Sequence, residues 1–484
     1  MLRRLKSSYA VIIIILLILS LYAYTKGCKK GEEDNLRKAE ESIRKNNLND
    51  ASKTLYEVIK NNPKSDKAYE LRIKLYSKLE RNRDLLDDYN KVVELRGSEQ
   101  LPVLKEICLS MIISLLNSND TDVRVNAIRV IGDLGDKSFI PDIQNLLNDE
   151  DDEVKNESAV ALKKLGFVPS EEYLKKLFNS GDERNKMYAI GAWGEDGKVS
   201  SIPEFKEALN DKNSDVKIET AKALGNKGDN TAVASLKKLL RDKDAEVRLY
   251  AARSLFKFGE KSALNTLVSA LKSEDSDIRT TAIRILGEAG GKNAIVELKN
   301  ALKDKDEIVR KEAVDALGKL GNKSVLPELL NVLKDQDYDV RASAALAIYK
   351  LGGLSSIIEK LKKDLVDNNP ETRSIAVQVI GEMGRETISA DEFAKIRQLL
   401  KDEDPEVRFT AVRSLGLISD KSEIEGIKKM LNDEDDEVKL EAIVALGRIG
   451  NSQVIKDLRK LLGKKIRHPD FELQIPLALL KIIK

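Results

Sequence analysis

KDEDPEVRFTAVRSLG, residues 401–416, recurs in related form along most of the chain. When Val407 is taken as position 0, the equivalent residues are Val123, Val154, Asn185, Val216, Val247, Ile278, Val309, Val340, Thr372, Val407 and Val438. Neighbouring copies are 31 residues apart, except for intervals of 32 and 35 residues on either side of Thr372. A fixed period of this length is typical of a solenoid, in which small helical units stack on one another.

Each copy predicts one helix and its two ends. Position −3 is Asp or Asn in every copy, and Pro405 directly follows it, as expected for a helix N-cap and a first-turn proline. Small or apolar residues at +4, +5 and +8 give helical periodicity. Glycine at +12 in ten copies suits the left-handed residue that ends a helix. A second amphipathic stretch follows, as at 140–147, so each repeat should contain two antiparallel helices.

These motifs resemble the HEAT repeat, in the short form also seen in phycobilisome-lyase-type repeats, over residues 99–468. The resemblance implies an all-α, right-handed superhelical solenoid of about eleven two-helix repeats. HEAT repeats serve mostly as scaffolds, which implies a non-enzymatic protein that binds a protein or peptide partner on its concave face. The alternative is a HEAT-like repeat lyase, or another enzyme or enzyme-accessory protein.

Position +1 is basic in all eleven copies, and position −5 is always Asp or Ser. On a helical wheel the +1 base falls on the buried arc, so we expect paired charges along the turns between helices. Arg310, for example, should pair with Asp304 or with a neighbouring turn group. The alternative is a basic stripe that binds phosphate, which a buried arc disfavours.

Two further positions bear on packing. Glycine at +9 in eight copies should let neighbouring helices approach closely. The third repeat departs from the pattern, with Asn185 in an apolar position and Trp193 where Leu or Ile is usual. Local repacking around Trp193 is one interpretation, and a hinge or binding notch is the other.

Composition excludes several function classes. Charged residues make up 34% of the 484 residues with a net charge of +2, so no nucleic-acid partner is expected. His468 is the single histidine, which excludes the histidine–glutamate di-iron site of HEAT-repeat hydroxylases, and histidine-based zinc sites and triads. We therefore expect no catalytic or metal site, no cofactor and no small-molecule substrate. Cys28 and Cys108 lie in different contexts and do not indicate a disulfide framework, and Cys108 is expected to be a buried core thiol.

Residues 1–30 are predicted to be a membrane anchor or signal segment. Arg3, Arg4 and Lys6 precede an apolar run at 9–24, which is about 24 Å long as a helix. Three alternatives are open: an uncleaved anchor, a cleaved secretory signal, or a lipoprotein signal with lipidation at Cys28. The segment TKGC at 25–28 has the small residue before cysteine but departs from a lipobox at Thr25 and Lys26. We expect a membrane-anchored protein with most of the chain outside the cytoplasm.

The remaining segments flank the repeats. Residues 31–98 resemble two tetratricopeptide-like repeats, with Pro63 twelve residues after Ala51, although Leu85 replaces the usual small residue. Four amphipathic helices that cap the solenoid are the alternative. Residues 469–484 are apolar and are predicted to form a C-terminal capping helix.

Positions +3, +6 and +10 should line the concave face, and two clusters there are unusual for a solvated surface. The aromatic and basic cluster comprises Tyr188, Lys222, Tyr250, Arg253 and Arg284, and the apolar cluster comprises Leu346 and Ile375. Such side chains are enriched at binding sites, so we expect an acidic or tyrosine-tolerant protein segment to lie there. Crowding of long side chains on a concave wall is the alternative.

Overall fold

The computed structural model describes residues 30–196, 203–227, 232–260, 263–384, 389–462 and 470–483. All regular elements in these ranges are helices, which confirms the predicted all-α solenoid. None of the described helices is long and apolar enough to cross a membrane. The predicted membrane segment and Cys28 lie outside the described residues.

The chain forms two compact bodies. The central body comprises residues 119–449, and the terminal body comprises residues 1–118 together with 450–484. The chain therefore leaves the terminal body at Ser118 and returns to it at Gly450. The domain boundaries inferred from the sequence stay a prediction.

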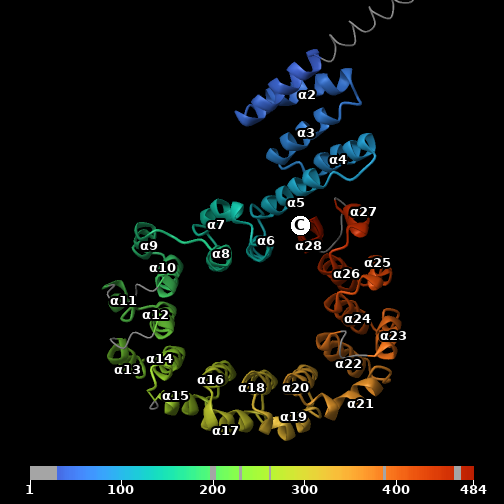
Figure 1. The fold of residues 1–484 in the computed structure, drawn as a ribbon. Coiled ribbons are helices and arrows are strands. Elements are labelled where there is room, and N and C mark those ends of the chain that lie inside the picture. The colour runs from blue at the N-terminus through green and yellow to red at the C-terminus, as the bar shows by residue number, and fades with distance from the viewer. Residues whose placement is uncertain are drawn as a thin grey trace, which may run out of the picture. The chain divides into compact units, whose positions relative to one another are not determined.

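The recurring segment forms one helix per repeat, and Figure 1 shows these inner helices on the concave side of the central body. The inner helices are α6 (Thr121–Leu134), α8 (Asp152–Lys164), α10 (Glu183–Asp196), α12 (Ser214–Lys227), α14 (Ala245–Lys257), α16 (Ser276–Ala289), α18 (Glu307–Lys319), α20 (Tyr338–Lys350), α22 (Pro370–Met383), α24 (Pro405–Ile418) and α26 (Asp436–Ile449). Their ends follow the predicted rules. At the start of α24, the Asp404 side chain accepts hydrogen bonds from the amides of Glu406 and Val407. After the end of α18, Gly321 adopts the left-handed conformation, with φ 70°.

The outer helices alternate with the inner ones along the chain. They are α7 (Ile140–Leu146), α9 (Glu171–Phe178), α11 (Pro203–Ala208), α13 (Val233–Leu239), α15 (Ala263–Ala270), α17 (Gly291–Ala301), α19 (Leu326–Val332), α21 (Leu354–Asp364), α23 (Ala390–Leu399) and α25 (Ile424–Met430). Short 3₁₀ turns precede some of them, at Lys137–Phe139, Lys323–Val325 and Lys421–Glu423. The predicted two-helix repeat is thus present in the described part of the array.

The +1 bases form buried bridges between consecutive repeats. Arg310 donates two hydrogen bonds of 2.8 Å to the carboxylate of Asp335, which lies 25 residues later. Its third nitrogen donates to the main-chain carbonyls of Asp304, at 3.0 Å, and Lys305, at 3.3 Å. Of the two expected partners, the turn carbonyls are confirmed and the Asp304 carboxylate is wrong, because the guanidinium of Arg310 extends to the carboxylate of the next repeat.

We call this contact the inter-repeat bridge. It recurs between the +1 base and the −5 Asp of the next repeat at Arg124–Asp149, Lys186–Asp211, Lys217–Asp242, Arg279–Asp304, Arg310–Asp335, Arg373–Asp402 and Arg408–Asp433, over 2.7–3.1 Å. Where position −5 is Ser180, Lys155 bonds to Asp182 instead. Each bridging Asp can also accept a main-chain amide, as Asp335 does from Asp337 at 2.9 Å. One carboxylate therefore fixes its own turn and the neighbouring repeat together.

Glycine at +9 lets the inner helices touch, as expected. A Cβ at Gly287 would lie 2.8 Å from the Cβ of Ala316 in the next repeat, which is too close for a real contact. Three described joints lack this glycine and have Lys163, Phe256 or Tyr349 instead. The inner helices approach each other less extensively there, between α8 and α10, α14 and α16, and α20 and α22.

The third repeat is repacked around its tryptophan. Trp193 is 1% exposed and lies between Phe178 and Phe205, with ring centroids 5.6 and 6.2 Å away, and its indole nitrogen donates to Glu171 at 3.2 Å. Asn185 is buried as well, and its side-chain oxygen has no hydrogen-bond partner. This supports the interpretation of local repacking, with one polar side chain poorly accommodated.

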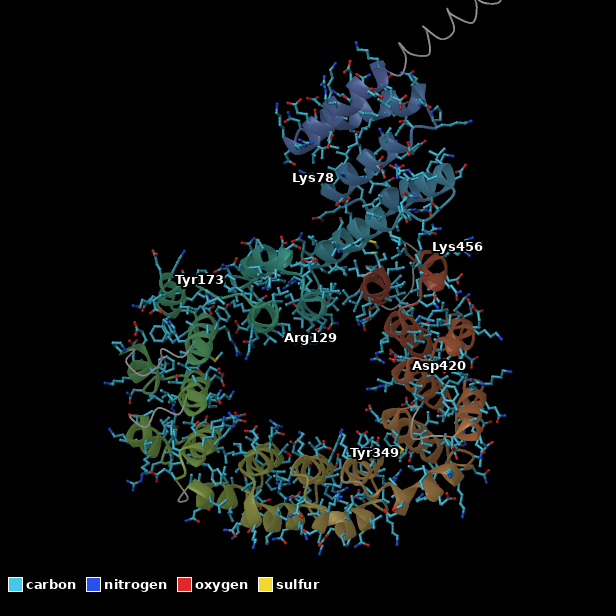
Figure 2. All side chains as sticks on the ribbon, viewed as in Figure 1. Lys78, Arg129, Tyr173, Tyr349, Asp420 and Lys456 are labelled. Atoms are coloured by element: carbon cyan, nitrogen blue, oxygen red, sulfur yellow. The ribbon has the colours of Figure 1, made fainter. Side chains whose placement is uncertain are left out.

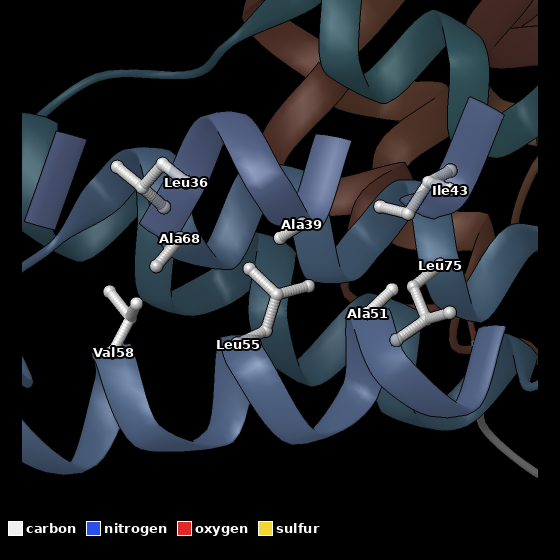
Figure 3. Packing of buried hydrophobic residues seen from close by; sticks show 8 residues of the cluster. All are labelled: Leu36, Ala39, Ile43, Ala51, Leu55, Val58, Ala68 and Leu75. Carbon is white, nitrogen blue, oxygen red and sulfur yellow. The ribbon is translucent and has the colours of Figure 1, made fainter. Parts of the chain in front are cut away.

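The terminal body combines the two ends of the chain. A helix over residues 30–44 packs with α2 (Leu48–Asn61) and α3 (Asp66–Lys78) around a core of Leu36, Ala39, Ile43, Ala51, Leu55, Val58, Ala68 and Leu75 (Figure 3). Helices α4 (Asn82–Arg96) and α5 (Leu101–Leu115) follow. Cys108 on α5 is fully buried, as expected, and burial raises the pKa of its thiol.

The C-terminal segment folds back on these helices. After a 3₁₀ turn at Ser452–Val454 come α27 (Ile455–Arg459) and α28 (Asp470–Ile483), and α28 packs against α5 and α27. Arg459 forms an ion pair with Glu99 at 3.0 Å, and Glu99 also accepts a hydrogen bond from Tyr89 at 3.0 Å. The predicted capping helix exists, and the surface that it covers includes α5, which precedes it by about 370 residues.

We predict that Arg310→Ala lowers the free energy of unfolding by about 3–5 kcal/mol, because it leaves a buried carboxylate without its partner. Urea denaturation at neutral pH measures this loss. Lys311→Ala is the matched control, since Lys311 is 43% exposed and only 3.7 Å from Asp339, and it should cost less than about 1 kcal/mol. Equal losses in the two variants would contradict a buried structural role for the +1 base.

The same comparison has a pH dependence. Burial favours the neutral form of Asp335, but hydrogen bonds from Arg310 and from the Asp337 amide outweigh burial and lower the pKa of this carboxyl. A depressed pKa means that the bridge stabilises the fold above the usual carboxyl range and that this contribution is lost as the pH falls through the lowered value. The difference in free energy of unfolding between the wild type and Arg310→Ala should therefore be constant near neutral pH and should decrease at acidic pH.

Candidate partner-binding groove

A second row of contacts runs along the concave surface of the central body. In this surface row, position +6 of one repeat lies against position +3 or +10 of the next. Arg129 is 3.0 Å from Glu157, Arg284 is 3.4 Å from Glu312, and Arg253 is 2.5 Å from Glu288. Figure 2 shows Arg129 and Tyr349 on this side and Tyr173 of α9 on the outer side.

The predicted aromatic and basic cluster belongs to this row. Lys222 lies 4.5 Å from the ring centroid of Tyr250 and 3.4 Å from Glu219. Arg253 and Arg284 each have a carboxylate partner in the next repeat. Because these cations are already paired, their charge alone gives no reason to prefer an acidic partner. Lys222, Tyr250 and Arg253 are half-buried, and only Arg284 is exposed.

Apolar side chains occupy the row at two joints. At the joint of α20 and α22 the residues are Leu346, which is half-buried, and Ile375. Ile375 is only 9% exposed, so the expectation of an apolar surface residue there is wrong. At the joint of α8 and α10 the residues are Val160 and Tyr188, and Val160 is 45% exposed.

An apolar groove with a volume of 580 Å³ lies at the joint of α8 and α10. Its floor and walls come from both inner helices and from the loop after α8, and include Ala159, Val160, Phe167, Val168, Met187, Tyr188 and Gly191. Lys155, Lys163, Arg184 and Glu219 supply its charges. Val168 is 78% exposed, so the groove presents apolar surface to solvent.

Three departures from the repeat consensus create this groove. Lys163 replaces the +9 glycine, so α8 and α10 do not close on each other as other inner helices do. Gly191 leaves position +6 without a side chain, and a Cβ there would lie 3.2 Å from a Glu219 oxygen. Phe167, Val168 and Pro169 follow Gly166, whereas mostly polar residues follow the equivalent glycine elsewhere, as in DKS at 136–138 and NKS at 322–324.

The charges around the groove are unevenly placed. Lys155 forms ion pairs with Asp182 at 2.9 Å and with Asp152 at 3.1 Å. These contacts raise the pKa of its ammonium group, and the hydrogen bond to Asp182 has the larger effect. Arg184 lies 3.5 Å from the Asn156 side chain. Beside the groove is a smaller recess of 250 Å³, lined by Asp152, Asp182, Glu183 and Asp215 as well as Arg184.

Sequence analysis identified Tyr188 and singled out the third repeat, but it missed Val160 and Val168. The sequence does distinguish these two residues, because most other residues at +6 are charged and most residues in the turn after +12 are polar. Among the described residues no group of three His, Cys, Asp or Glu is placed to hold a metal ion. His468 lies outside the described residues.

One comparison with known proteins identifies the repeat. The family model for HEAT repeats matches residues 109–184, 170–248, 236–307, 295–362, 354–429 and 393–468. No curated protein matches the chain. Among solved structures, the Escherichia coli protein YibA is 22% identical, with 56% of this chain and 97% of YibA covered and a TM-score of 0.34.

Two further solved structures match this chain with similar sequence identity. Human deoxyhypusine hydroxylase is 19% identical, with 52% of this chain and 96% of the hydroxylase covered and a TM-score of 0.25. The CpcE–CpcF complex of phycocyanin lyase from Nostoc is 24% identical, with coverages of 46% and 91% and a TM-score of 0.30. Since the family model covers most of its length, the chain belongs to the HEAT-repeat family.

Proposed function

We propose that the chain is a non-enzymatic scaffold that holds a protein or peptide partner on the concave side of its inner helices. The observation that carries this proposal is the groove at the joint of α8 and α10, where the paired charges of the surface row give way to exposed apolar side chains. A solvated wall has no need of Val160 and Val168 at these positions, whereas a binding surface uses such residues as its contact area.

The enzymatic alternative makes a different demand on the site. A lyase or another enzyme built on these repeats needs several polar groups that converge in a deep pocket. The groove is instead lined mostly by apolar residues and glycine, and Lys155, one of its four charged residues, is already paired with Asp152 and Asp182. This arrangement favours binding of a chain segment over catalysis.

We further propose that the N-terminal segment tethers this scaffold to a membrane, with residues 31–484 on the extracytoplasmic side. The proposal rests on the apolar run at 9–24 and the basic residues that precede it. Tethering suits a scaffold because it confines the partner to the membrane surface and raises its effective concentration there.

A cross-linking experiment tests the partner-binding proposal. A photo-crosslinking phenylalanine analogue in place of Val160 should give a discrete adduct in intact cells, because this position lies in the groove. The same analogue in place of Val296, a 55% exposed residue of the outer helix α17, is the matched control and should give none. Tyr250→Ala with Arg253→Ala should weaken the adduct if the partner extends along the surface row. Equal adducts from positions 160 and 296 would contradict binding on the concave side.

Protease added to spheroplasts tests the tether. It should digest the repeats while the protein stays in the membrane fraction, and full protection of the repeats would contradict the proposed topology. Metabolic labelling with a fatty acid then separates the two kinds of tether. Cys28→Ala should abolish the label if Cys28 is lipidated, whereas a transmembrane anchor would carry no label in either protein.

A further inference from the structure

The apolar groove between α8 and α10 continues into the acidic recess beside it. Arg184 and Met187 line both hollows, so the two form one continuous surface, which starts at the joint of α8 and α10 and reaches the first turn of α12 at Asp215. Val160 and Val168 give the apolar part, and Glu183 and Asp215 stand at the other part. A ligand that lies along the joint therefore meets apolar surface first and carboxylates next.

The size of this surface suits a short extended segment of polypeptide. Lys155 and Lys163 mark the ends of the groove on α8 and are eight residues apart, which corresponds to about 12 Å along a helix. An extended chain covers that length with about four residues. The 580 Å³ of the groove holds a large apolar side chain together with part of the main chain on either side of it.

The net charge along the joint is negative. Five carboxylates line the two hollows, from Asp152, Asp182, Glu183, Asp215 and Glu219, against three cations from Lys155, Lys163 and Arg184. Lys155 is paired with Asp152 and Asp182, and Glu219 is paired with Lys222. Glu183, which accepts a hydrogen bond from the Asn213 side chain, and Asp215 are exposed to solvent. Other inner helices also have acidic residues in their first turn. This joint differs from them because exposed apolar residues lie directly beside its acidic residues.

We infer that the joint of α8 and α10 binds an extended segment of a partner protein in which a large apolar side chain and a basic side chain point to the same side of the chain. Alternate residues of an extended chain point to the same side, so both side chains face the protein together. The apolar side chain packs on Val160 and Val168, and the basic one lies in the recess near Glu183 and Asp215. This inference rests on the proposed function and specifies the chemistry of the partner.

Three labelled peptides with one common frame test the inference by fluorescence anisotropy on the purified full-length protein. Their central residues are Arg-Ser-Leu, Glu-Ser-Leu and Arg-Ser-Ser. We expect Arg-Ser-Leu to bind at least tenfold more tightly than either of the others, because only it fills both hollows with matching chemistry. Equal binding of the three, no binding at all, or a preference for Glu-Ser-Leu would overturn the inference, and the last result would indicate an acidic partner.

Two substitutions locate the binding site. Val160→Lys should abolish binding of Arg-Ser-Leu without changing helicity or melting temperature, since Val160 is 45% exposed, and Val296→Lys on α17 should leave binding intact. Asp215→Lys should weaken Arg-Ser-Leu and strengthen Glu-Ser-Leu, because it reverses one charge of the recess. Retained binding in Val160→Lys, or an equal loss in Val296→Lys, would overturn the placement.

The peptide result and the cross-linking result fail independently. The peptides report on the chemistry of the groove in purified protein and require no cellular partner. If position 160 captures a partner in cells but no peptide binds, the inference on chemistry is wrong and the proposed function stands. If Arg-Ser-Leu binds at this joint and position 160 captures nothing in cells, the chemistry is right and the proposed function fails.

Discussion

The buried bridge between the +1 base of one repeat and the −5 Asp of the next is the contact on which the array depends. Arg310 has its guanidinium satisfied on three sides, by the Asp335 carboxylate and by two carbonyls of its own turn. Asp335 in turn accepts the Asp337 amide. Because the same groups fix a turn and a neighbour, the bridge sets the register of one repeat on the next, at the cost of desolvating both charges.

Fixed register is what lets the surface row vary. The inner helices are held at most joints by a bridge and by the close approach of a +9 glycine, so positions +3 and +6 of successive repeats meet at corresponding places on the concave side. Three of these places hold ion pairs, at Arg129–Glu157, Arg253–Glu288 and Arg284–Glu312, which fill space without attracting a partner strongly. At the joint of α8 and α10 the glycine is Lys163 and the pair is Val160 and Tyr188, so the same framework presents a groove.

The repeated features could be predicted from the sequence, because a residue type that recurs at the same position in eleven copies indicates a shared structural role. The helices, their N-caps and the left-handed glycines were all predicted correctly from their positions in the repeat. The partner of the bridge could not be predicted, because Arg310 has one Asp six residues before it and another 25 residues after it, and spacing alone does not choose between them. The groove depends on residues that differ from the repeat pattern in one copy only, such as Val168. That these residues line a groove is visible only once the fold places α10 beside α8. Likewise the apolar character of α28 predicts burial, but only the fold shows that α5 is what covers it.

A double-mutant cycle on Arg408 and Asp433 tests the central role of the bridge most directly, because this pair is buried and joined by two 2.9 Å hydrogen bonds. Arg408→Met and Asp433→Leu should each lower the free energy of unfolding by about 3–5 kcal/mol, since each strands a buried charge. The double variant should lose far less than the sum, because two apolar side chains then meet where two charges were. Losses that simply add would show that the two groups stabilise the array independently, and would contradict the account.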